Sequence, residues 1–136
     1  MRLLVTGGLG FIGSNFIRFV LQNYPDAKII NLDKVTYCGN PDNLKDVEKD
    51  PRYTFVKGDI CDAELVSKLV SQVDYVANFA AETHVDRSIH IGSREFVMTN
   101  TVGVQTILDA VRRNSQIKKF VSVSTDEVYG NKLLDL

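Results

Sequence analysis

Apolar runs alternate with amphipathic stretches along this chain, and the alternation predicts strands that take turns with helices. Residues 3–5 are apolar throughout, as a strand buried on both faces requires. The other runs that predict strands cover residues 28–33, 53–57, 73–81 and 118–124. Five strands interleaved with helices predict an α/β fold built on a doubly wound parallel sheet.

Helical periodicity fills the intervals between these strands. Apolar residues recur at helical spacing from Phe16 to Leu21, until Tyr24 and Pro25 end the pattern. Asp62 is a suitable N-cap for a second helix, whose apolar side carries Leu65, Val66, Leu69 and Val70.

Two longer stretches bear on function. The connection over residues 34–52 allows a short helix over 43–49, and connections of this length are often functional. The longest helix is predicted over residues 94–113, with an apolar surface broader than one sheet contact requires. Core packing on two sides would explain that breadth, and so would a subunit interface that forms a homodimer through this helix.

Four glycines stand between the first predicted strand and the first predicted helix. Gly7 or Gly8 allows a tight turn, Gly10 lets a pyrophosphate approach the backbone, and Gly13 lets the helix pack closely on the strand. The helix would then face the phosphates with unpaired N–H groups and the positive end of its dipole. Glycines can also form a plain loop, but the order of strand, turn and helix favours a dinucleotide site of the Rossmann type.

Asp33 ends the second predicted strand, twenty residues after Gly13. A carboxylate at this place accepts hydrogen bonds from an adenosine 2′-hydroxyl and repels a 2′-phosphate, which favours NAD over NADP. The alternative is a solvated acid at the end of a strand. Lys34 follows directly and weakens the charge argument.

Length and composition exclude several other classes of function. The 136 residues fit one domain, and a formal net charge of −1 favours neither nucleic acid nor an anionic membrane as partner. No apolar stretch approaches the roughly 18 residues of a membrane span. Met1 leads directly into a strand, so we expect no signal peptide and a cytoplasmic protein. Cys38 and Cys61 fit no metal-ligand spacing, so free thiols and no metal are expected.

Polar residues follow the fourth and fifth predicted strands, at 82–88 and 124–127. The carboxyl ends of parallel strands face the ligand crevice. Asp126 and Glu127 would repel each other, and partial burial would raise the pKa of at least one, so one could act as acid and the other as base. Thr125 could donate to a substrate hydroxyl or a developing carbonyl. The simpler explanations are a solvated loop at 82–88 and an acidic turn at 124–127.

Four segments carry a resemblance to the extended short-chain dehydrogenase/reductase family. They are Thr-Gly-Gly-Leu-Gly-Phe-Ile-Gly-Ser at 6–14, Gly-Asp-Ile-Cys-Asp at 58–62, Ala-Ala-Glu-Thr-His-Val-Asp-Arg-Ser at 80–88 and Ser-Thr-Asp-Glu-Val-Tyr-Gly at 124–130. The resemblance extends along residues 1–130, and within the family it is strongest to the 4,6-dehydratases that act on dTDP-glucose. The glycine motif is general to the superfamily, whereas the last two segments together are much more specific.

The resemblance implies a reaction and a set of binding residues. C4 of the nucleotide-bound glucose would give a hydride to NAD+, Glu127 would remove the C5 proton, and Asp126 would protonate the leaving C6 hydroxyl before the hydride returns to C6. Thr125 would hydrogen-bond the C4 oxygen, and Thr83 would lie near the sugar. The NAD site would comprise Gly7, Gly10, Phe11, Ile12, Gly13, Asp33, Lys34, Thr36, Asp59, Ile60, Ala80, Ala81 and Thr99.

One expected element of the family is missing from these residues. Members carry Tyr-x-x-x-Lys on the helix after the fifth strand, where the tyrosine is the base for C4 oxidation. Residues 24–28 and 53–57 have the spacing, but the first straddles Pro25 and the second lies on a strand expected far from the crevice. Tyr129 and Lys132 are one residue too close together.

We therefore expect residues 1–136 to form an incomplete NAD-binding domain without the substrate domain, and the isolated chain to be inactive or nearly so. Residues 131–136 depart from the family pattern. An NAD-binding module or pseudoenzyme fragment without chemistry remains an alternative, and so does another nucleotide-sugar dehydratase or decarboxylase. The intact acidic pair argues for dehydration, because a simple epimerase has no elimination to catalyse.

Overall fold

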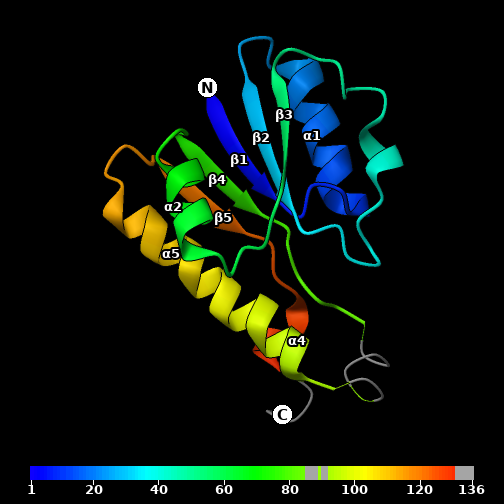
Figure 1. The fold of residues 1–136 in the computed structure, drawn as a ribbon, viewed down its shortest axis with the longest axis vertical. Coiled ribbons are helices and arrows are strands. Elements are labelled where there is room, and N and C mark those ends of the chain that lie inside the picture. Colours follow the sequence, from blue (N-terminus) through cyan, green and yellow to red (C-terminus); the bar gives the residue numbers. More distant parts are fainter. Residues whose placement is uncertain (85–88, 90–91, 131–136) are drawn as a thin grey trace, which may run out of the picture.

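Five parallel strands form the centre of the molecule in a computed structural model that describes residues 1–84, 89 and 92–130 (Figure 1). Along the sheet the order is β3-β2-β1-β4-β5, and every neighbouring pair is parallel. The predicted doubly wound sheet is confirmed. The strands are β1 (Arg2–Thr6), β2 (Lys28–Asp33), β3 (Tyr53–Lys57), β4 (Tyr75–Asn78) and β5 (Lys119–Ser122).

Helices cover the sheet from both sides (Figure 1). The helix α1 packs on one face, and α2 and α5 pack side by side on the other. Within the described ranges, no helix is both long and apolar enough to cross a membrane. The helical elements are α1 (Phe11–Asn23), η1 (Pro41–Leu44), α2 (Ala63–Val70), α4 (Arg94–Val97), η2 (Met98–Gly103), α5 (Val104–Arg113) and η3 (Asp126–Tyr129).

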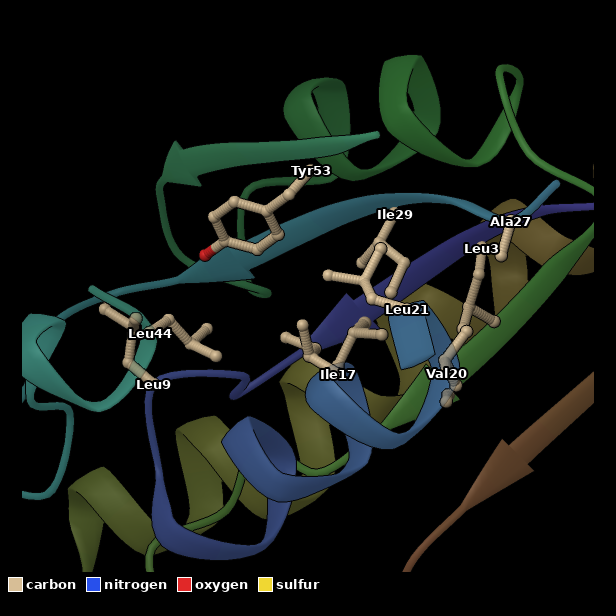
Figure 2. Packing of buried hydrophobic residues seen from close by; sticks show 11 residues of the cluster. Leu3, Leu9, Ile17, Val20, Leu21, Ala27, Ile29, Leu44 and Tyr53 are labelled. Carbon is tan, nitrogen blue, oxygen red and sulfur yellow. The ribbon is translucent and has the colours of Figure 1, made fainter. Parts of the chain in front are cut away.

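The apolar run of β1 supplies both halves of the core. Leu3 and Val5 face α1, where they join a cluster that Figure 2 shows from close by, and Leu4 faces α2 and α5. All three side chains are buried. A parallel strand covered on both faces needs apolar residues at every position, and this explains why β1 shows no alternation.

Several predicted boundaries differ from the structure. The strand β1 is longer than 3–5 by one residue at each end, whereas β4 and β5 are shorter than 73–81 and 118–124 at both ends. The short helix allowed over 43–49 is wrong. A 3-10 helix forms earlier, at Pro41–Leu44, because Asn40 caps it by accepting from the Asp42 N–H at 3.0 Å and Pro41 suits the first turn.

The predicted N-cap of α2 and the long helix over 94–113 are both present. The Asp62 carboxylate accepts from the Leu65 N–H at 3.0 Å. The long helix is continuous but changes type, since η2 is a π-helix between α4 and α5. Ile107 and Ala110 are buried against the core, whereas Leu108 remains exposed. The homodimer through this helix stays a prediction.

An ion pair joins the first residue of β1 to the residue before β4. The Arg2 guanidinium lies 2.6 Å from the Asp74 carboxylate, and the Arg2 backbone N–H donates to the same group at 2.9 Å. The side-chain hydrogen bond with Arg2, followed by the backbone bond, lowers the pKa of Asp74 to about 2.

We predict that this pair makes stability depend on acid. The folded pKa of Asp74 lies below its ordinary value of 3.8, so the contribution is complete above about pH 4 and is lost as the pH falls through about 2. Urea unfolding at pH intervals should therefore give Asp74→Asn a flatter stability curve than the wild type across this window. Asp109→Asn, which changes a half-buried carboxylate on α5 that lies 3.6 Å from Arg112, should follow the wild type. Parallel curves for Asp74→Asn and the wild type would contradict the prediction.

Candidate functional site

Two side chains of β2 hold the glycine turn between β1 and α1. The Gly8 N–H donates to Asn31 Oδ1 at 3.1 Å, and the Leu9 N–H donates to Asp33 Oδ2 at 2.9 Å. Asn31 and Asp33 are two residues apart on one strand, so both point to the same face of the sheet. Both are buried, which protects these bonds from competition with water.

The remaining N–H groups of the turn are also used within the chain. Gly7 donates to the Leu32 carbonyl at 3.0 Å, and Gly10 donates to the Gly7 carbonyl at 3.2 Å. The helix α1 begins directly afterwards, and no side chain caps its N-terminus. The donors that the turn leaves for a ligand are therefore the first N–H groups of α1, which begins with Phe11.

Gly10 differs from the other glycines of the turn in the space before it. A Cβ atom at Gly7, Gly8 or Gly13 would collide with the backbone of Ala80, the side chain of Asn31 or the Gly7 carbonyl, respectively. A Cβ at Gly10 would meet only the Gly7 carbonyl, at an ordinary contact distance of 3.4 Å. The packing of the chain thus requires three of the glycines, and Gly10 faces open space that a ligand can occupy.

A pocket opens beside this turn, at the carboxyl edge of the sheet between β1 and β4. This is the point at which the strand order reverses, where ligands of open α/β sheets bind. All predicted NAD residues line the pocket except Phe11, Ile12 and Gly13, which belong to the turn and the start of α1. The lining residues are Gly7, Gly10, Leu32, Asp33, Lys34, Thr36, Cys38, Gly39, Gly58, Asp59, Ile60, Phe79, Ala80, Ala81, Glu82 and Thr99.

Asp33 holds the turn as well as facing the pocket. Its other oxygen, Oδ1, accepts from the Val35 N–H at 2.8 Å. Val35 has φ 60°, a left-handed conformation that a β-branched residue adopts only under strain. A carboxylate has about four lone-pair positions, so Asp33 can accept a ribose hydroxyl in addition to these two N–H groups.

Lys34 is paired with Asp59 across the pocket. The ammonium and the carboxylate approach to 2.8 Å. Burial alone would raise the pKa of Asp59, but the Cys61 N–H and Lys34 outweigh it, and the pKa is lowered. The hydrogen bond to Asp59 raises the pKa of Lys34. The positive charge of Lys34, which weakens the argument that Asp33 favours NAD over NADP, is thus paired with another carboxylate.

The connection after β2 is fastened to the turn and to α1. The Leu9 carbonyl accepts from the Asn40 N–H at 3.2 Å and from Asn43 Nδ2 at 2.9 Å. Arg18 of α1 pairs with Asp46 at 2.8 Å and also donates to the Asn43 carbonyl. These bonds hold the segment that carries Lys34, Thr36, Cys38 and Gly39 over the pocket.

Polar side chains also link the strands on the other side of the turn. Thr6 donates to Asn78 Oδ1 at 2.5 Å, and Asn78 Nδ2 donates to Ser122 Oγ at 3.1 Å, which joins β1, β4 and β5. Asn100 in η2 binds the backbone N–H and carbonyl of Glu82 at 2.9 and 2.8 Å. The π-helix therefore fixes the segment after β4 and brings Thr99 to the pocket.

Thr125 and Asp126, two of the residues predicted for catalysis, do not line this pocket. The strand β5 ends at Ser122, and Thr125 and Asp126 are exposed beyond it. The burial expected to divide the acidic pair is absent at Asp126, because the chain has already left the sheet there. Thr83 is exposed and does not line the pocket. The Glu127 side chain and residues 85–88, 90–91 and 131–136 lie outside the described part.

Sequence reasoning missed several residues that shape this site. Asn31 and Asn78 are polar positions within apolar strands, a pattern that can indicate a buried hydrogen-bonding role. Nothing in the sequence marked Asn100, because its role depends on the π-helical turn.

Cys38 is exposed and Cys61 is half-buried with its thiol 3.2 Å from the Met98 carbonyl. The described residues contain no cluster of three metal-ligating side chains.

Residues 4–133 match the family described as GDP-mannose 4,6 dehydratase. A dTDP-glucose 4,6-dehydratase of Mycobacterium tuberculosis is 50% identical over 135 residues, which cover 99% of this chain and 39% of that protein. The low-salt glycan biosynthesis protein Agl12 of Haloferax volcanii is 53% identical over 130 residues, covering 96% of this chain and 41% of that protein. The chain thus spans about 40% of the length of the curated relatives it matches.

Two solved structures illustrate the range of similarity. The dTDP-glucose 4,6-dehydratase DesIV of Streptomyces venezuelae, solved with NAD bound, has a TM-score of 0.88 and 51% identity, covering 96% of this chain and 41% of that one. A UDP-glucuronic acid 4-epimerase of Bacillus cereus, also solved with NAD, has a TM-score of 0.84 and 30% identity, covering 97% of this chain and 42% of that one.

We predict that substitution by alanine lowers stability more at Gly13 than at Gly10. Gly13→Ala forces a Cβ onto the Gly7 carbonyl and should lower the free energy of unfolding by about 1–3 kcal/mol. Gly10→Ala meets no such obstacle and should cost less than about 1 kcal/mol. Urea unfolding measured on both variants tests the difference. Equal losses of stability would show that Gly10 is also required by internal packing.

Proposed function

This chain belongs to the family described as GDP-mannose 4,6 dehydratase, and from that membership we propose that it supplies the NAD site of a nucleotide-sugar 4,6-dehydratase. The proposed reaction converts dTDP-glucose to its 4-keto-6-deoxy sugar, a lyase activity. The observation that carries the proposal is the glycine turn, whose own N–H groups are all bonded within the chain while Gly10 and the uncapped start of α1 face open space.

The residues around the turn fit the parts of NAD. The first N–H groups of α1, at Phe11 and Ile12, would bind the pyrophosphate. Asp33 would accept the adenosine ribose hydroxyls, and Asp59 and Ile60 would line the cofactor. Bound there, NAD would supply the acceptor and donor of hydride. The other residues proposed to line the cofactor are Gly7, Gly10, Gly13, Lys34, Thr36, Ala80, Ala81 and Thr99.

Charge supports NAD over NADP. The Asp33 carboxylate is buried, with only 8% of the residue exposed, so a 2′-phosphate would approach it with little screening by water. Lys34 is the neighbouring cation, and its ammonium is paired with Asp59. Structures of relatives solved with NAD agree with this choice.

The acid and base of the dehydration are proposed from the segment after β5. Glu127 would take the C5 proton, Asp126 would protonate the leaving C6 hydroxyl, and Thr125 would hydrogen-bond the C4 oxygen, with Thr83 near the sugar. Adjacent carboxyl groups can divide these tasks only if their environments differ. Asp126 is exposed in this chain, so substrate or further protein would have to cover the segment before catalysis.

An NAD-binding module without chemistry is the second candidate for the 136-residue chain by itself. It is favoured by the exposure of Thr125 and Asp126. This candidate predicts cofactor binding without turnover of any nucleotide sugar.

We predict that the chain binds NAD+ in preference to NADP+ by about tenfold or more, since about 1.4 kcal/mol of repulsion at Asp33 is sufficient for that factor. Calorimetry on the purified chain measures both affinities. Gly10→Ala should retain the fold and lose NAD+ affinity, because its methyl group occupies the space before the turn. Equal affinities for the two cofactors, or no loss in Gly10→Ala, would contradict the proposed mode of binding.

We predict that this chain can replace the matching segment of the Mycobacterium tuberculosis dehydratase. The chimera should form the 4-keto-6-deoxy product from dTDP-glucose. UDP-glucose and GDP-mannose should be assayed separately as alternative substrates. Glu127→Gln in the chimera should lower kcat by a factor of about 10²–10⁴, because the C5 proton loses its base. Asp109→Asn is the matched control on α5. The 136-residue chain alone should give no product, and turnover by it would refute its inactivity.

A further inference from the structure

We propose that Tyr53 is a positioning residue for the glycine turn and acts through the side chain of Asn31. The inference rests on the proposed dinucleotide site, because it concerns how that site is held ready for its ligand. It also gives a role to a tyrosine that the sequence places on a strand away from the crevice.

Three groups from three parts of the chain form a buried relay. Asn31 Nδ2 donates to the Tyr53 hydroxyl oxygen at 2.8 Å, and Asn31 Oδ1 accepts from the Gly8 N–H at 3.1 Å. Asn31 has no exposed surface, and Tyr53 is only 9% exposed. The relay therefore runs from β3 through β2 to the turn without contact with bulk water.

The Tyr53 hydroxyl anchors the end of the Asn31 amide that faces away from the turn. An asparagine side chain presents a donor at one end and an acceptor at the other, and only the acceptor can receive the Gly8 N–H. The Gly8 N–H can only donate and therefore sets Oδ1 toward the turn, while the Tyr53 oxygen accepts from Nδ2 and holds the amide in that position. Without the hydroxyl, the buried Nδ2 donor loses its partner and the amide loses one of the two contacts that hold it in place.

The ring of Tyr53 has a separate role from its hydroxyl. Figure 2 shows the ring in the cluster beside α1, with its oxygen directed toward the side where Leu9 and Leu44 lie. Burial raises the pKa of Tyr53, so the hydroxyl stays neutral at physiological pH. Tyr53→Phe therefore keeps the packing of the ring and removes only the contact with Asn31.

The consequence for the ligand follows from the position of Gly8. Gly8 lies between Gly7, which approaches the Ala80 backbone, and Leu9, which is held by Asp33. A Gly8 peptide that is free to rotate would loosen the start of α1, whose N–H groups are the proposed pyrophosphate donors. Tyr53 would thus affect cofactor affinity without touching the cofactor.

The test combines Tyr53→Phe with NMR amide exchange and NAD+ calorimetry on the full 136-residue chain. Exchange of the Gly8 amide should accelerate by about tenfold relative to that of Val5 in the core, and NAD+ affinity should fall by about tenfold, as expected for one lost buried hydrogen bond. Tyr75→Phe is the matched control, since it removes a hydroxyl from a half-buried tyrosine on β4. It should leave both quantities unchanged.

A double-mutant cycle with Asn31→Ala decides whether the effect passes through Asn31. If it does, Tyr53→Phe adds nothing to Gly8 exchange once Asn31 is alanine. Additive effects, or unchanged Gly8 exchange in Tyr53→Phe, would overturn the proposal. If the wild-type chain binds no NAD+ and Tyr53→Phe still accelerates Gly8 exchange, the relay is supported and the NAD function is rejected. Faster exchange with unchanged NAD+ affinity would reject the positioning role.

Discussion

The glycine turn can bind a ligand only if its own polar groups are satisfied without the ligand. Four consecutive N–H groups, from Gly7 to Gly10, are bonded within the chain, two of them to the buried side chains of Asn31 and Asp33. An unpaired buried N–H would cost about 1–3 kcal/mol, so these side chains determine the path of the turn as much as the glycines do. Only then does α1 begin, with first N–H groups that no side chain of the described residues caps.

This requirement explains why β2 carries two buried polar residues. Asn31 and Asp33 project toward the turn, while Leu32 between them belongs to the opposite core. Asp33 has a double task, because it holds Leu9 and the strained Val35 while it faces the pocket. A substitution there changes the turn and the ribose position together, so loss of binding in such a variant would not isolate either one.

The sequence was sufficient for the fold and for the glycine turn, because both follow from local rules, whereas most of the other predicted pocket residues came from the family resemblance. Apolar periodicity located the strands, and glycines, Asp33 and Asp62 act through short-range geometry that their spacing reveals. The π-helical turn was not predictable, since it depends on how Asn100 meets Glu82 across the crevice. The exposure of Asp126 was not predictable either, because it depends on where β5 leaves the sheet.

The two parts of the proposed site differ in how far this chain completes them. On the cofactor side, Asn31, Asp33 and Asn78 are buried, and each has hydrogen-bonding partners within the described residues. Val121 in β5 and Val123 just after it are exposed, although parallel sheets are usually covered on both faces, and Thr125 and Asp126 lie in the same exposed region. Carboxyl groups in water keep similar acidities, whereas acid–base catalysis by an adjacent pair needs them to differ. The chain therefore carries the means to bind a dinucleotide in its own packing, while the chemistry proposed for Asp126 and Glu127 requires a cover over this edge of the sheet.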